Sequence, residues 1–546
     1  MKKRFLALFA ALCMVVSLLG ACGNSESGSK ETAKPDNKET QAAQTDAGDA
    51  DETKAETDAP AADAGDDDED MAEVNMVYLS MSAIPNDLQM VEDALNEITE
   101  AQINTHVNIE MIEVGNYDQQ IGLKTSSNEK VDLMLTLPMG SSSFNNMASQ
   151  NQLMDITEYL NEYGKGVLDT VGDLINATTK DGKIVGVTTY RSLVSSEYII
   201  MRTDVLEDLG LLEKAQNMKS MSEYTEILKA VKESEKWSNL AGIVASDGQG
   251  TCMPLAGGYI GVDSFDDAYV YDQLGDLNKI IAINPDGSDP TVQNNFATDQ
   301  YKAMWTQMKE WYDAGYVYKD VTTTKEMAED LVKSNVAFSY FSQSELGVEA
   351  AKTVACGMPV TCVRIITLPI STSSCTKFVW TVPSSATEPE AAVKLMNLMY
   401  TSPEVENLLA YGIEGTHYQV KDGVGYYMDG QDSNNCGYHT ADFLFGNQFN
   451  CLPFDGQDPD IRTQAKEEMD AAITSAYLGF SCDTTAIQSE ISAVVNVLAE
   501  FRPSIDSGLA SEEDYQNFLD KMDASGLQTI IDEYQKQLNT WLEANK

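Results

Sequence analysis

The chain contains 546 residues, which is enough for roughly three or four domains of about 150 residues or for two large interleaved lobes. Its 86 acidic and 36 basic residues give a formal net charge of -50 at pH 7. Because such an acidic surface repels nucleic-acid phosphates, this charge excludes a nucleic-acid partner. The hydrophobic fraction of 43% is sufficient for a large buried core.

The N-terminus has the layout of an export signal. Three basic residues at positions 2–4 precede an apolar run of about 15 residues, which is too short to span a bilayer comfortably. The run ends in Leu19-Gly20-Ala21-Cys22, which resembles the lipobox of bacterial lipoproteins. We therefore expect residues 1–21 to be a signal peptide and Cys22 to carry lipid. An ordinary signal with a chance cysteine is the alternative.

Residues 22–73 have the composition of a disordered tether. Ala, Thr, Ser, Asp, Glu and Lys dominate, and aliphatic and aromatic side chains are almost absent. Such a segment cannot bury enough surface to fold. Calcium binding by the acidic run at 66–70 is the alternative to a solvated tail, but the run lacks the glycine and ligand spacing of a calcium loop.

Seven cysteines remain beyond Cys22. Export permits disulfides, and Cys436 with Cys451, or a pair among Cys356, Cys362 and Cys375, are close enough in sequence for a bridge, although the connectivity cannot be read from sequence. The odd number leaves at least one thiol unpaired. A zinc site at Cys436, His439 and Cys451 is not favoured because no second pair stands at ligand spacing.

The sequence contains no recognisable catalytic motif. Its three histidines stand outside any H-E-x-x-H pattern, and no G-x-S-x-G elbow or glycine-rich phosphate loop is present. Carboxylate pairs are uninformative among 86 acidic residues. We expect no enzymatic activity, no cofactor and no metal site.

Strands and helices alternate after the tether. Strands are predicted near residues 75–80, 107–112 and 130–138, with helices at 87–102 and 117–124. This alternation is typical of a helix-covered parallel sheet. Ligands of such sheets bind at the carboxyl ends of the strands, which directs attention to Ser82, Ala83, Met139, Gly140 and Ser141.

A second α/β region follows. Strands are predicted within 182–190 and 195–201, and helices at 221–235, 299–315 and 324–334. Trp305, Met308, Trp311 and Tyr312 repeat at helical spacing. Such a stripe is more typical of a core than of a ligand platform.

In this order, the segments resemble the bacterial extracellular solute-binding proteins of the family that includes the maltose-binding protein, the substrate receptors of ABC importers. The string at 411–418 looks like the longer LipO-type lipoprotein subgroup. Departures are Asn335, where a glycine is usual, and the cysteine-rich stretches 356–375 and 436–451. The motifs that carry the resemblance, besides the lipobox, are Val131-Asp132-Leu133, Gly182-Lys183-Ile184-Val185-Gly186, Arg202-Thr203-Asp204-Val205-Leu206 with Leu209-Gly210, Ser220 with Glu223-Tyr224, Trp311-Tyr312-Asp313-Ala314-Gly315-Tyr316 and Asn335-Val336-Ala337-Phe338-Ser339.

The resemblance implies an α/β fold of two discontinuous lobes with a hinge and an interlobe cleft, of the type II periplasmic-binding-protein kind. The chain would cross between lobes near 190–196 and again near 380–384. Hinge closure would trap the ligand and present a closed surface to the permease. The implied boundaries are 74–192 and 381–485 for lobe 1, and 193–380 with mainly the C-terminal helices of 486–546 for lobe 2.

The resemblance also suggests where ligand contacts lie. Tyr190, Phe341 and Trp380 would offer flat faces to a sugar. Trp380 as interlobe core, Tyr340 in place of Phe341, and a structural turn at Glu414 and His417 are the alternatives. We expect Trp380→Ala to weaken binding more than it lowers stability. The expected contacts are Ser82, Ala83, Met139, Gly140, Ser141, Tyr190, Arg191, Ser195, Phe341, Gln343, Trp380, Glu414 and His417.

The function that follows is a monomeric receptor, anchored to the membrane by lipid on the extracytoplasmic face, for an ABC importer. Its solute is expected to be a neutral carbohydrate, most simply an oligosaccharide, because the acidic field disfavours anions. A peptide-binding receptor, a surface glycosidase and a structural lipoprotein are the alternatives.

Overall fold

The computed structural model describes residues 70–246, 252–253, 258–259, 263–433 and 435–545. The predicted signal peptide, Cys22 and nearly all of the tether lie outside these residues. Strand β1 (Ala72–Ser80) begins inside the range assigned to the tether. Within the described residues, no helix has the length and apolar character needed to cross a membrane.

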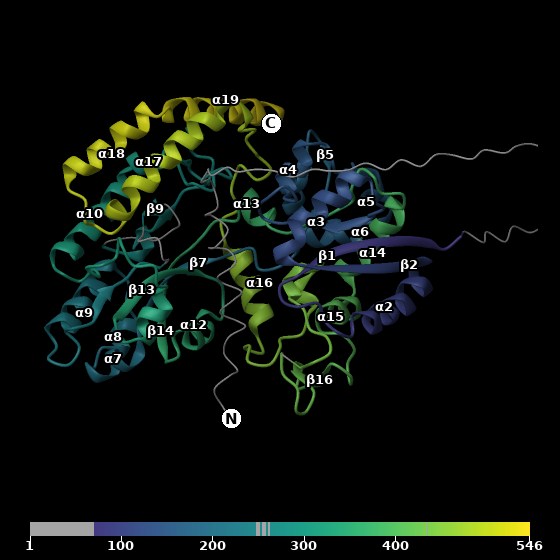
Figure 1. Ribbon diagram of the computed structural model, residues 1–546, viewed down its shortest axis with the longest axis horizontal. Helices are drawn as coiled ribbons and strands as arrows, with labels where there is room; N and C mark the ends of the chain where they lie inside the picture. The colour runs from purple at the N-terminus through teal and green to yellow at the C-terminus, as the bar shows by residue number, and fades with distance from the viewer. Residues whose placement is uncertain (1–69, 247–251, 254–257, 260–262, 434, 546) are drawn as a thin grey trace, which may run out of the picture. The chain divides into compact units, whose positions relative to one another are not determined.

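The first sheet has five strands in the order β2-β1-β3-β15-β6. Its strands β1 and β2 lie side by side in Figure 1. Strand β1 runs parallel to β2 (Thr105–Glu113) and to β3 (Leu133–Leu135), as predicted. Strand β15 (Val379–Thr381) inserts antiparallel between β3 and β6 (Val187–Thr188). The continuous apolar run at 131–137 is buried although only three of its residues form β3.

Helices cover this sheet. The predicted helices appear as α2 (Leu88–Ile103) and α3 (Val114–Ser127). Helix α15 (Pro403–Tyr411) begins where the Ser402 side chain accepts a hydrogen bond from the Val405 amide, with proline in its first turn. The other helices of this lobe are α4 (Phe144–Ser149), α5 (Thr157–Tyr163), α6 (Lys165–Val171) and α14 (Pro389–Thr401).

The second sheet has the order β14-β7-β13-β8. Strand β7 (Ser196–Arg202) lies between β13 (Ala337–Ser344) and β14 (Val360–Thr367) and is antiparallel to both, whereas β13 is parallel to β8 (Ala241–Ile243). Side chains on both faces of β13 are buried, since Phe341 belongs to one core and Tyr340 to a second. Helices therefore pack on both sides of this sheet.

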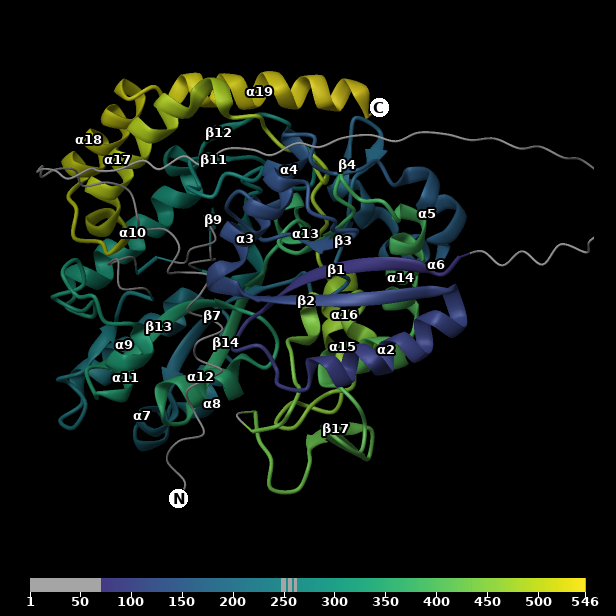
Figure 2. The same ribbon diagram turned by 45° about the vertical axis from the view of Figure 1, so that its right-hand side comes forward.

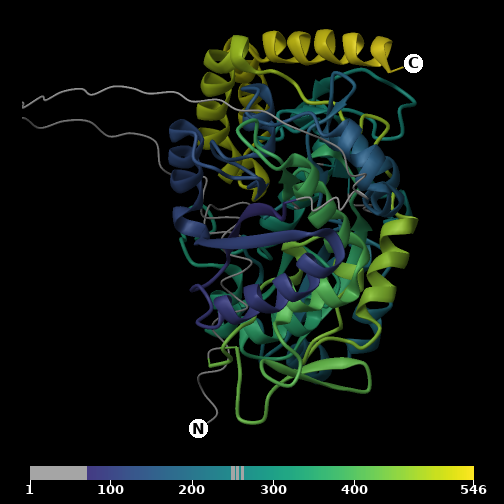
Figure 3. The same cartoon turned by 90° about the vertical axis from the view of Figure 1, so that its right-hand side faces the viewer.

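The helices of the second lobe include the predicted ones at α9 (Met221–Glu233), α10 (Asp299–Asp313) and α11 (Ala328–Lys333). Trp305, Met308 and Trp311 are buried, which confirms the core assignment of the α10 stripe. The C-terminal helices α17 (Gln488–Asp506), α18 (Glu512–Ala524) and α19 (Leu527–Ala544) pack into the same core beside α10 (Figures 1 and 2). The described chain ends at the tip of α19 (Figure 3).

Shorter elements complete the fold. Asp181 and Gly182 both have positive φ in the turn between β4 (Thr179–Lys180) and β5 (Lys183–Ile184), as a tight hairpin requires. The remaining helices and strands are α7 (Thr203–Asp208), α8 (Leu212–Gln216), α12 (Val348–Cys356), α13 (Thr372–Cys375), α16 (Ile461–Ala471), β9 (Gly258–Tyr259), β10 (Tyr269–Val270), β11 (Ile281–Ala282), β12 (Gln293–Asn294), β16 (Tyr418–Lys421) and β17 (Val424–Tyr427).

Strand pairing corrects two of the predicted lobe boundaries. Because β15 pairs with β3 and β6, Trp380 belongs to the first lobe, and the chain crosses at residues 368–378 rather than at 380–384. Tyr477 and Phe480 already belong to the core of the second lobe, so the chain returns there before residue 485. We call the three connecting segments, residues 189–195, 368–378 and 472–476, the crossover region.

Candidate functional site

The crossover region joins the two sheets. Its first two segments are paired at both ends, since the Thr189 amide donates to the Phe378 carbonyl at 3.1 Å and the Leu368 amide donates to the Ser195 carbonyl at 2.8 Å. The third segment pairs with the second through Ile370, whose amide donates to Ile473 and whose carbonyl accepts from Ser475. The three segments are therefore coupled by backbone hydrogen bonds.

A small apolar cluster fills the crossover region. It lies apart from the two large cores and draws residues from all three connections and their neighbours. Its size is modest, so only limited apolar burial holds these segments. The members are Ala177, Leu193, Val194, Ile370, Cys375, Met469 and Leu478.

Half-buried aromatic rings accompany the crossover region. Tyr190 packs edge-on against Phe449 with ring centres 5.3 Å apart, and Phe378 packs against Phe443 at 5.6 Å. The Lys466 Nζ of α16 lies 6.0 Å from the centre of the Tyr190 ring. Rings that keep part of their surface exposed beside polar groups are typical of sugar-binding sites.

Arg191 is a buried charged side chain of the crossover region, with 6% of its surface exposed. Its Nη1 donates to the Ser192 carbonyl at 2.8 Å and its Nη2 to the Ser374 carbonyl at 3.2 Å. Its Cζ lies 5.8 Å from the centre of the Phe378 ring. Burial lowers the pKa of Arg191, and its Nε has no hydrogen-bond partner.

Ser195 and Gln343 meet at the adjoining edge of the second sheet. The Gln343 Nε2 donates to the Ser195 Oγ at 2.8 Å, and the Gln343 side chain is exposed. Thus four of the predicted contacts, Tyr190, Arg191, Ser195 and Gln343, lie in or beside the crossover region.

Phe341 lies in the core of the second lobe and not on a ligand-facing surface. It is fully buried, with ring centres 5.9 Å from Tyr224 and 6.2 Å from Trp311. Tyr340 is also buried, because both faces of β13 are covered, so the choice between these two neighbours does not arise.

Trp380 lies in the core of the first lobe. It is fully buried, its Nε1 donates to the Leu444 carbonyl at 3.0 Å, and its ring centre is 6.1 Å from that of Tyr78. Neither ligand contact nor interlobe packing describes this environment. The expectation that Trp380→Ala weakens binding more than stability is therefore reversed.

Glu414 and His417 belong to a structural turn of the first lobe. The His417 Nδ1 accepts from the Ile413 amide at 2.9 Å, and its Nε2 lies 3.4 Å from an Asp87 carboxylate oxygen, with 2% of His417 exposed. A Cβ at Gly412, where φ is +81°, would lie 2.5 Å from the His417 Nδ1. Glu414 is exposed in this turn, and the buried His417 is not available to a ligand.

One of the predicted contacts after β3, Ser141, lines a small pocket. The Ser141 Oγ and the Ser142 amide donate to the same Asp118 carboxylate oxygen at 3.0 and 2.7 Å. A Cβ at Gly140 would lie 2.7 Å from that oxygen. Met139 is half-buried in this loop, whereas Ser82 and Ala83 lie in an exposed loop after β1.

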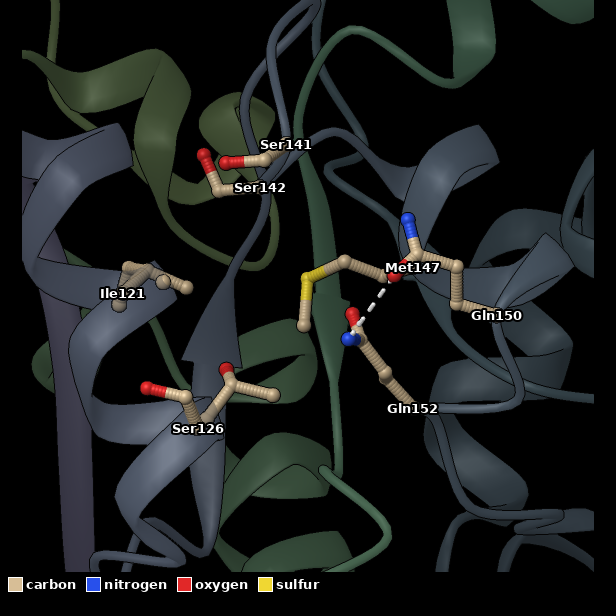
Figure 4. A pocket seen from close by; sticks show the side chains of 9 residues that line it. Ile121, Ser126, Ser141, Ser142, Met147, Gln150 and Gln152 are labelled. Carbon is tan, nitrogen blue, oxygen red and sulfur yellow. Dashed lines mark hydrogen bonds between the residues drawn. The ribbon is translucent and has the colours of Figure 1, made fainter.

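This pocket measures about 140 Å³ (Figure 4). The Met147 side chain reaches into it, and the Gln152 Nε2 donates to the Gln150 Oε1 at 3.2 Å. Pockets for small-molecule ligands usually measure about 300–1,000 Å³, so this one is too small for an oligosaccharide. Its lining is Ile121, Gly122, Thr125, Ser126, Ser141, Ser142, Met147, Gln150 and Gln152.

A second pocket, of about 340 Å³, lies on helices α5 and α14. Lys394 pairs with Glu390 at 2.6 Å and lies 4.8 Å from the Tyr163 ring centre. Within the described residues, no cluster of His, Cys, Asp and Glu has the geometry of a metal site. The lining of this second pocket is strongly acidic and consists of Asp155, Glu158, Tyr159, Glu162, Tyr163 and Glu390.

The structure forms none of the bridges that the sequence spacing allows. All seven cysteines among the described residues are free thiols. Cys451 is buried with its Sγ 3.7 Å from a Glu406 carboxylate oxygen, and the Cys356 Sγ lies 3.7 Å from the Tyr340 hydroxyl.

His439 packs between the Tyr411 and Phe454 rings, with distances of 5.2 and 4.6 Å between ring centres. Burial lowers the pKa of His439 to about 4.

A group of buried charged residues in the second lobe starts in β7, just beyond the crossover region. Glu197 is 1% exposed, and burial raises its pKa to about 8, while burial lowers the pKa of Lys279 to about 8. Deeper in the lobe, Asp506 pairs with Arg502 at 2.8 Å and accepts a hydrogen bond from the Tyr301 hydroxyl.

The sequence reasoning missed Lys377, Phe378, Phe443 and Phe449. The first two precede β15 in Cys375-Thr376-Lys377-Phe378-Val379, and placing the crossing one strand too late assigned them to a lobe interior. The signal that could have found them is the polar, serine-rich stretch just before this strand.

Comparison with known proteins defines the class to which the chain belongs. The family model described as "Bacterial extracellular solute-binding protein" matches residues 93–416, and a domain of unknown function (DUF3502) matches residues 476–543. The chain belongs to the bacterial extracellular solute-binding proteins. This membership makes it a solute-binding protein rather than an enzyme, and it places the chain outside the cytoplasm.

Individual relatives agree with this class. A carbohydrate ABC transporter substrate-binding protein of Streptococcus pneumoniae serotype 4 is 23% identical over 472 residues, which are 85% of this chain and 90% of that protein. Among solved structures, the N-glycan transport solute binding protein NgtS from Streptococcus pneumoniae has a TM-score of 0.70 at 20% identity and covers 87% of this chain and 100% of its own.

A second solved structure, an extracellular solute-binding protein from Bifidobacterium longum subsp. infantis, has a TM-score of 0.60 at 14% identity and covers 86% of this chain and 98% of its own. At these identities the solved structures establish the fold. They show the two-lobe α/β architecture of periplasmic binding proteins for the described chain.

Proposed function

We propose that this protein is the receptor of an ABC importer and binds an oligosaccharide in the crossover region. The observation that carries the proposal is the group of half-buried rings, Tyr190, Phe378, Phe443 and Phe449, beside the polar side chains of this region. Sugar rings stack on such faces while their hydroxyls need convergent donors and acceptors.

Two relatives support a carbohydrate ligand. The substrate-binding protein from Streptococcus pneumoniae is described as belonging to a carbohydrate ABC transporter. The NgtS protein has been solved in complex with Man1GlcNAc and with Man5GlcNAc. We propose a glycan of several residues for this chain on the same fold.

The proposed setting is the outer face of the cell membrane. Cys22 follows an apolar run that begins after three basic residues, and we propose that it carries the lipid anchor. The acidic segment after it would hold a monomeric receptor within reach of the permease subunits of the importer. Closure of the two lobes around the glycan would create the surface that the permease recognises.

Thermal unfolding of the full chain in detergent tests this proposal. Panels of oligosaccharides, monosaccharides and short peptides are added separately. A ligand that binds only the folded state stabilises it by about 2.7 kcal/mol at a hundredfold excess over Kd. We expect a shift with oligosaccharides alone. A shift with peptides alone, or with no solute, would overturn the proposal.

A further inference from the structure

Arg191 differs from the other arginines of the described chain in its electrostatic partners. Arg202 pairs with Asp204 at 2.6 Å, Arg364 with Glu468 at 2.5 Å and Arg502 with Asp506 at 2.8 Å, and Arg462 pairs with Asp442. Among the residues described, no carboxylate lies within 4.0 Å of Arg191. This is unexpected in a chain with a net charge of -50.

The hydrogen bonds of Arg191 leave its Nε–H without a partner. Nη1 and Nη2 each donate to a backbone carbonyl, of Ser192 and of Ser374, and neutral acceptors do not balance the positive charge. Nε has no partner although it is buried. Nε and the neighbouring Nη2 form the edge with which arginine binds a carboxylate in bidentate fashion. A buried charge without a counter-ion is costly, which favours an anionic partner at this edge.

A second cation lies on the connection that Arg191 contacts. Lys377 lies in the same connection as Ser374 and Phe378, the residues that Arg191 contacts, and both burial and the like charge of Arg191 lower its pKa. In the described part of the chain, no carboxylate forms an ion pair with Lys377 within 4.0 Å. Glu345, an exposed residue just beyond β13, acts on both cations only from a greater distance.

The surroundings of the two cations suit a sugar residue. Lys377 and Phe378 are half-buried, so a ligand can approach them from solvent. The Phe378 ring offers an apolar face next to the guanidinium, with the Arg191 Cζ 5.8 Å from the ring centre. An acidic sugar presents a carboxylate next to a flat ring face, and this pair of groups matches a cation beside an aromatic ring.

We propose that Arg191 and Lys377 form an anion-binding subsite that takes the carboxylate of an acidic sugar residue, such as a uronic acid, within the bound oligosaccharide. This inference rests on the proposed function and narrows its substrate class. The overall acidic field still disfavours polyanions, so the expected ligand is a largely neutral glycan that carries one carboxylate at this position.

The test compares three forms of one oligosaccharide. The first ends in a neutral hexose, the second has the C6 of that hexose oxidised to a carboxylate, and the third is the methyl ester of the second. Binding to the full chain is measured by calorimetry at low and high salt. We expect the carboxylate form to bind roughly tenfold more tightly than its ester, and the difference to shrink as salt rises.

Variants assign the effect to the two cations. Lys377→Gln should lower affinity for the carboxylate form by roughly tenfold and leave the ester unchanged. Arg191→Lys keeps the charge but removes the bidentate edge and should act in the same direction. Lys309→Gln is the matched control, because Lys309 is also half-buried but lies on α10 and pairs with Asp313 at 3.1 Å.

The outcomes separate the two proposals. Equal binding of the three forms, or a Lys377→Gln effect that is equal for all of them, would overturn the anion subsite and leave the oligosaccharide receptor intact. Binding of none of the three, together with no shift in the glycan panel, would overturn the proposed function and the subsite with it. Because Lys377 is half-buried and unpaired within the described chain, its variant is expected to fold even if Arg191→Lys does not.

Discussion

The sheet cores and the crossover region use aromatic side chains in opposite ways. In the cores, Trp380 and Phe341 are fully buried, and the Trp380 Nε1 is satisfied by the Leu444 carbonyl. In the crossover region, Phe378 and Tyr190 keep part of their surface exposed beside charged groups. The difference teaches that an aromatic residue near a predicted strand end is informative about binding only when its exposure is known.

The contrast between the sheet cores and the crossover region predicts that Trp380→Ala has the largest effect on stability. Removal of a fully buried indole should lower the free energy of unfolding by about 3–5 kcal/mol, because it leaves a cavity and an unpaired Leu444 carbonyl. Urea unfolding measures the loss. Trp541→Ala, a half-buried tryptophan on α19, is the control with a smaller loss. A small loss of stability with abolished glycan binding would contradict the core assignment of Trp380.

The next effect concerns pH and a buried carboxyl of the first lobe. Burial raises the pKa of Glu406 from its ordinary value of 4.5 to about 8, although the Asn447 amide donates to it. The folded state therefore binds more protons than the unfolded state between these pH values. The contribution of Glu406 to the free energy of unfolding is complete below pH 4.5 and is lost as the pH rises towards 8. Over this range the free energy of unfolding falls by up to about 1.4 kcal/mol per pH unit.

Glu406→Gln should flatten this part of the pH profile. Chemical unfolding between pH 5 and pH 8 measures the change, and Glu404→Gln, an exposed position on the same helix, is the control. A variant whose stability declines as steeply as that of the wild type would show that Glu406 is not the titrating group.

A smaller effect is expected for Phe378→Ala. Because the ring is half-buried, its removal should lower glycan affinity by roughly three- to tenfold while unfolding changes little. Phe341→Ala should do the reverse. Calorimetric titration and thermal unfolding of both variants measure the contrast. If Phe378→Ala lost stability but kept its glycan affinity, the predicted difference between the sheet cores and the crossover region would be contradicted.

The smallest effect is expected from reducing agent. Since the described cysteines are free thiols, dithiothreitol should leave the unfolding midpoint unchanged. Cys436 and Cys451 are the sensitive pair, because their sequence spacing favours a bridge that the structure does not form. Thiol counting under denaturing conditions, with and without reductant, measures this. A lower count without reductant would contradict the structure.

Much of the fold could be predicted from sequence patterns that are local. The alternation of strand and helix at residues 75–124 and the buried stripe of α10 follow from periodicity, and the structure confirms both. The second crossing could not be placed correctly, because β15 is only three residues long and its place between β3 and β6 depends on pairing with residues much earlier in the chain.

The candidate site was predictable only in part for the same reason. Tyr190 and Arg191 come shortly after β6 and Ser195 directly precedes β7, so all three were located from the first crossing. Phe341 was misassigned because burial of both faces of β13 depends on helices far away in the chain. Lys377 and Phe378 were missed because the second crossing was placed after them.

The interleaving of the two lobes has a consequence for how the chain folds during synthesis. The first sheet lacks its β15 until residue 381 has emerged, and the core of the second lobe waits for Leu538 in the last helix. Neither lobe can complete its core when only the first half of the chain has been synthesised. The nascent protein must therefore stay incompletely folded until translation is almost finished, which is when a chaperone would be most needed.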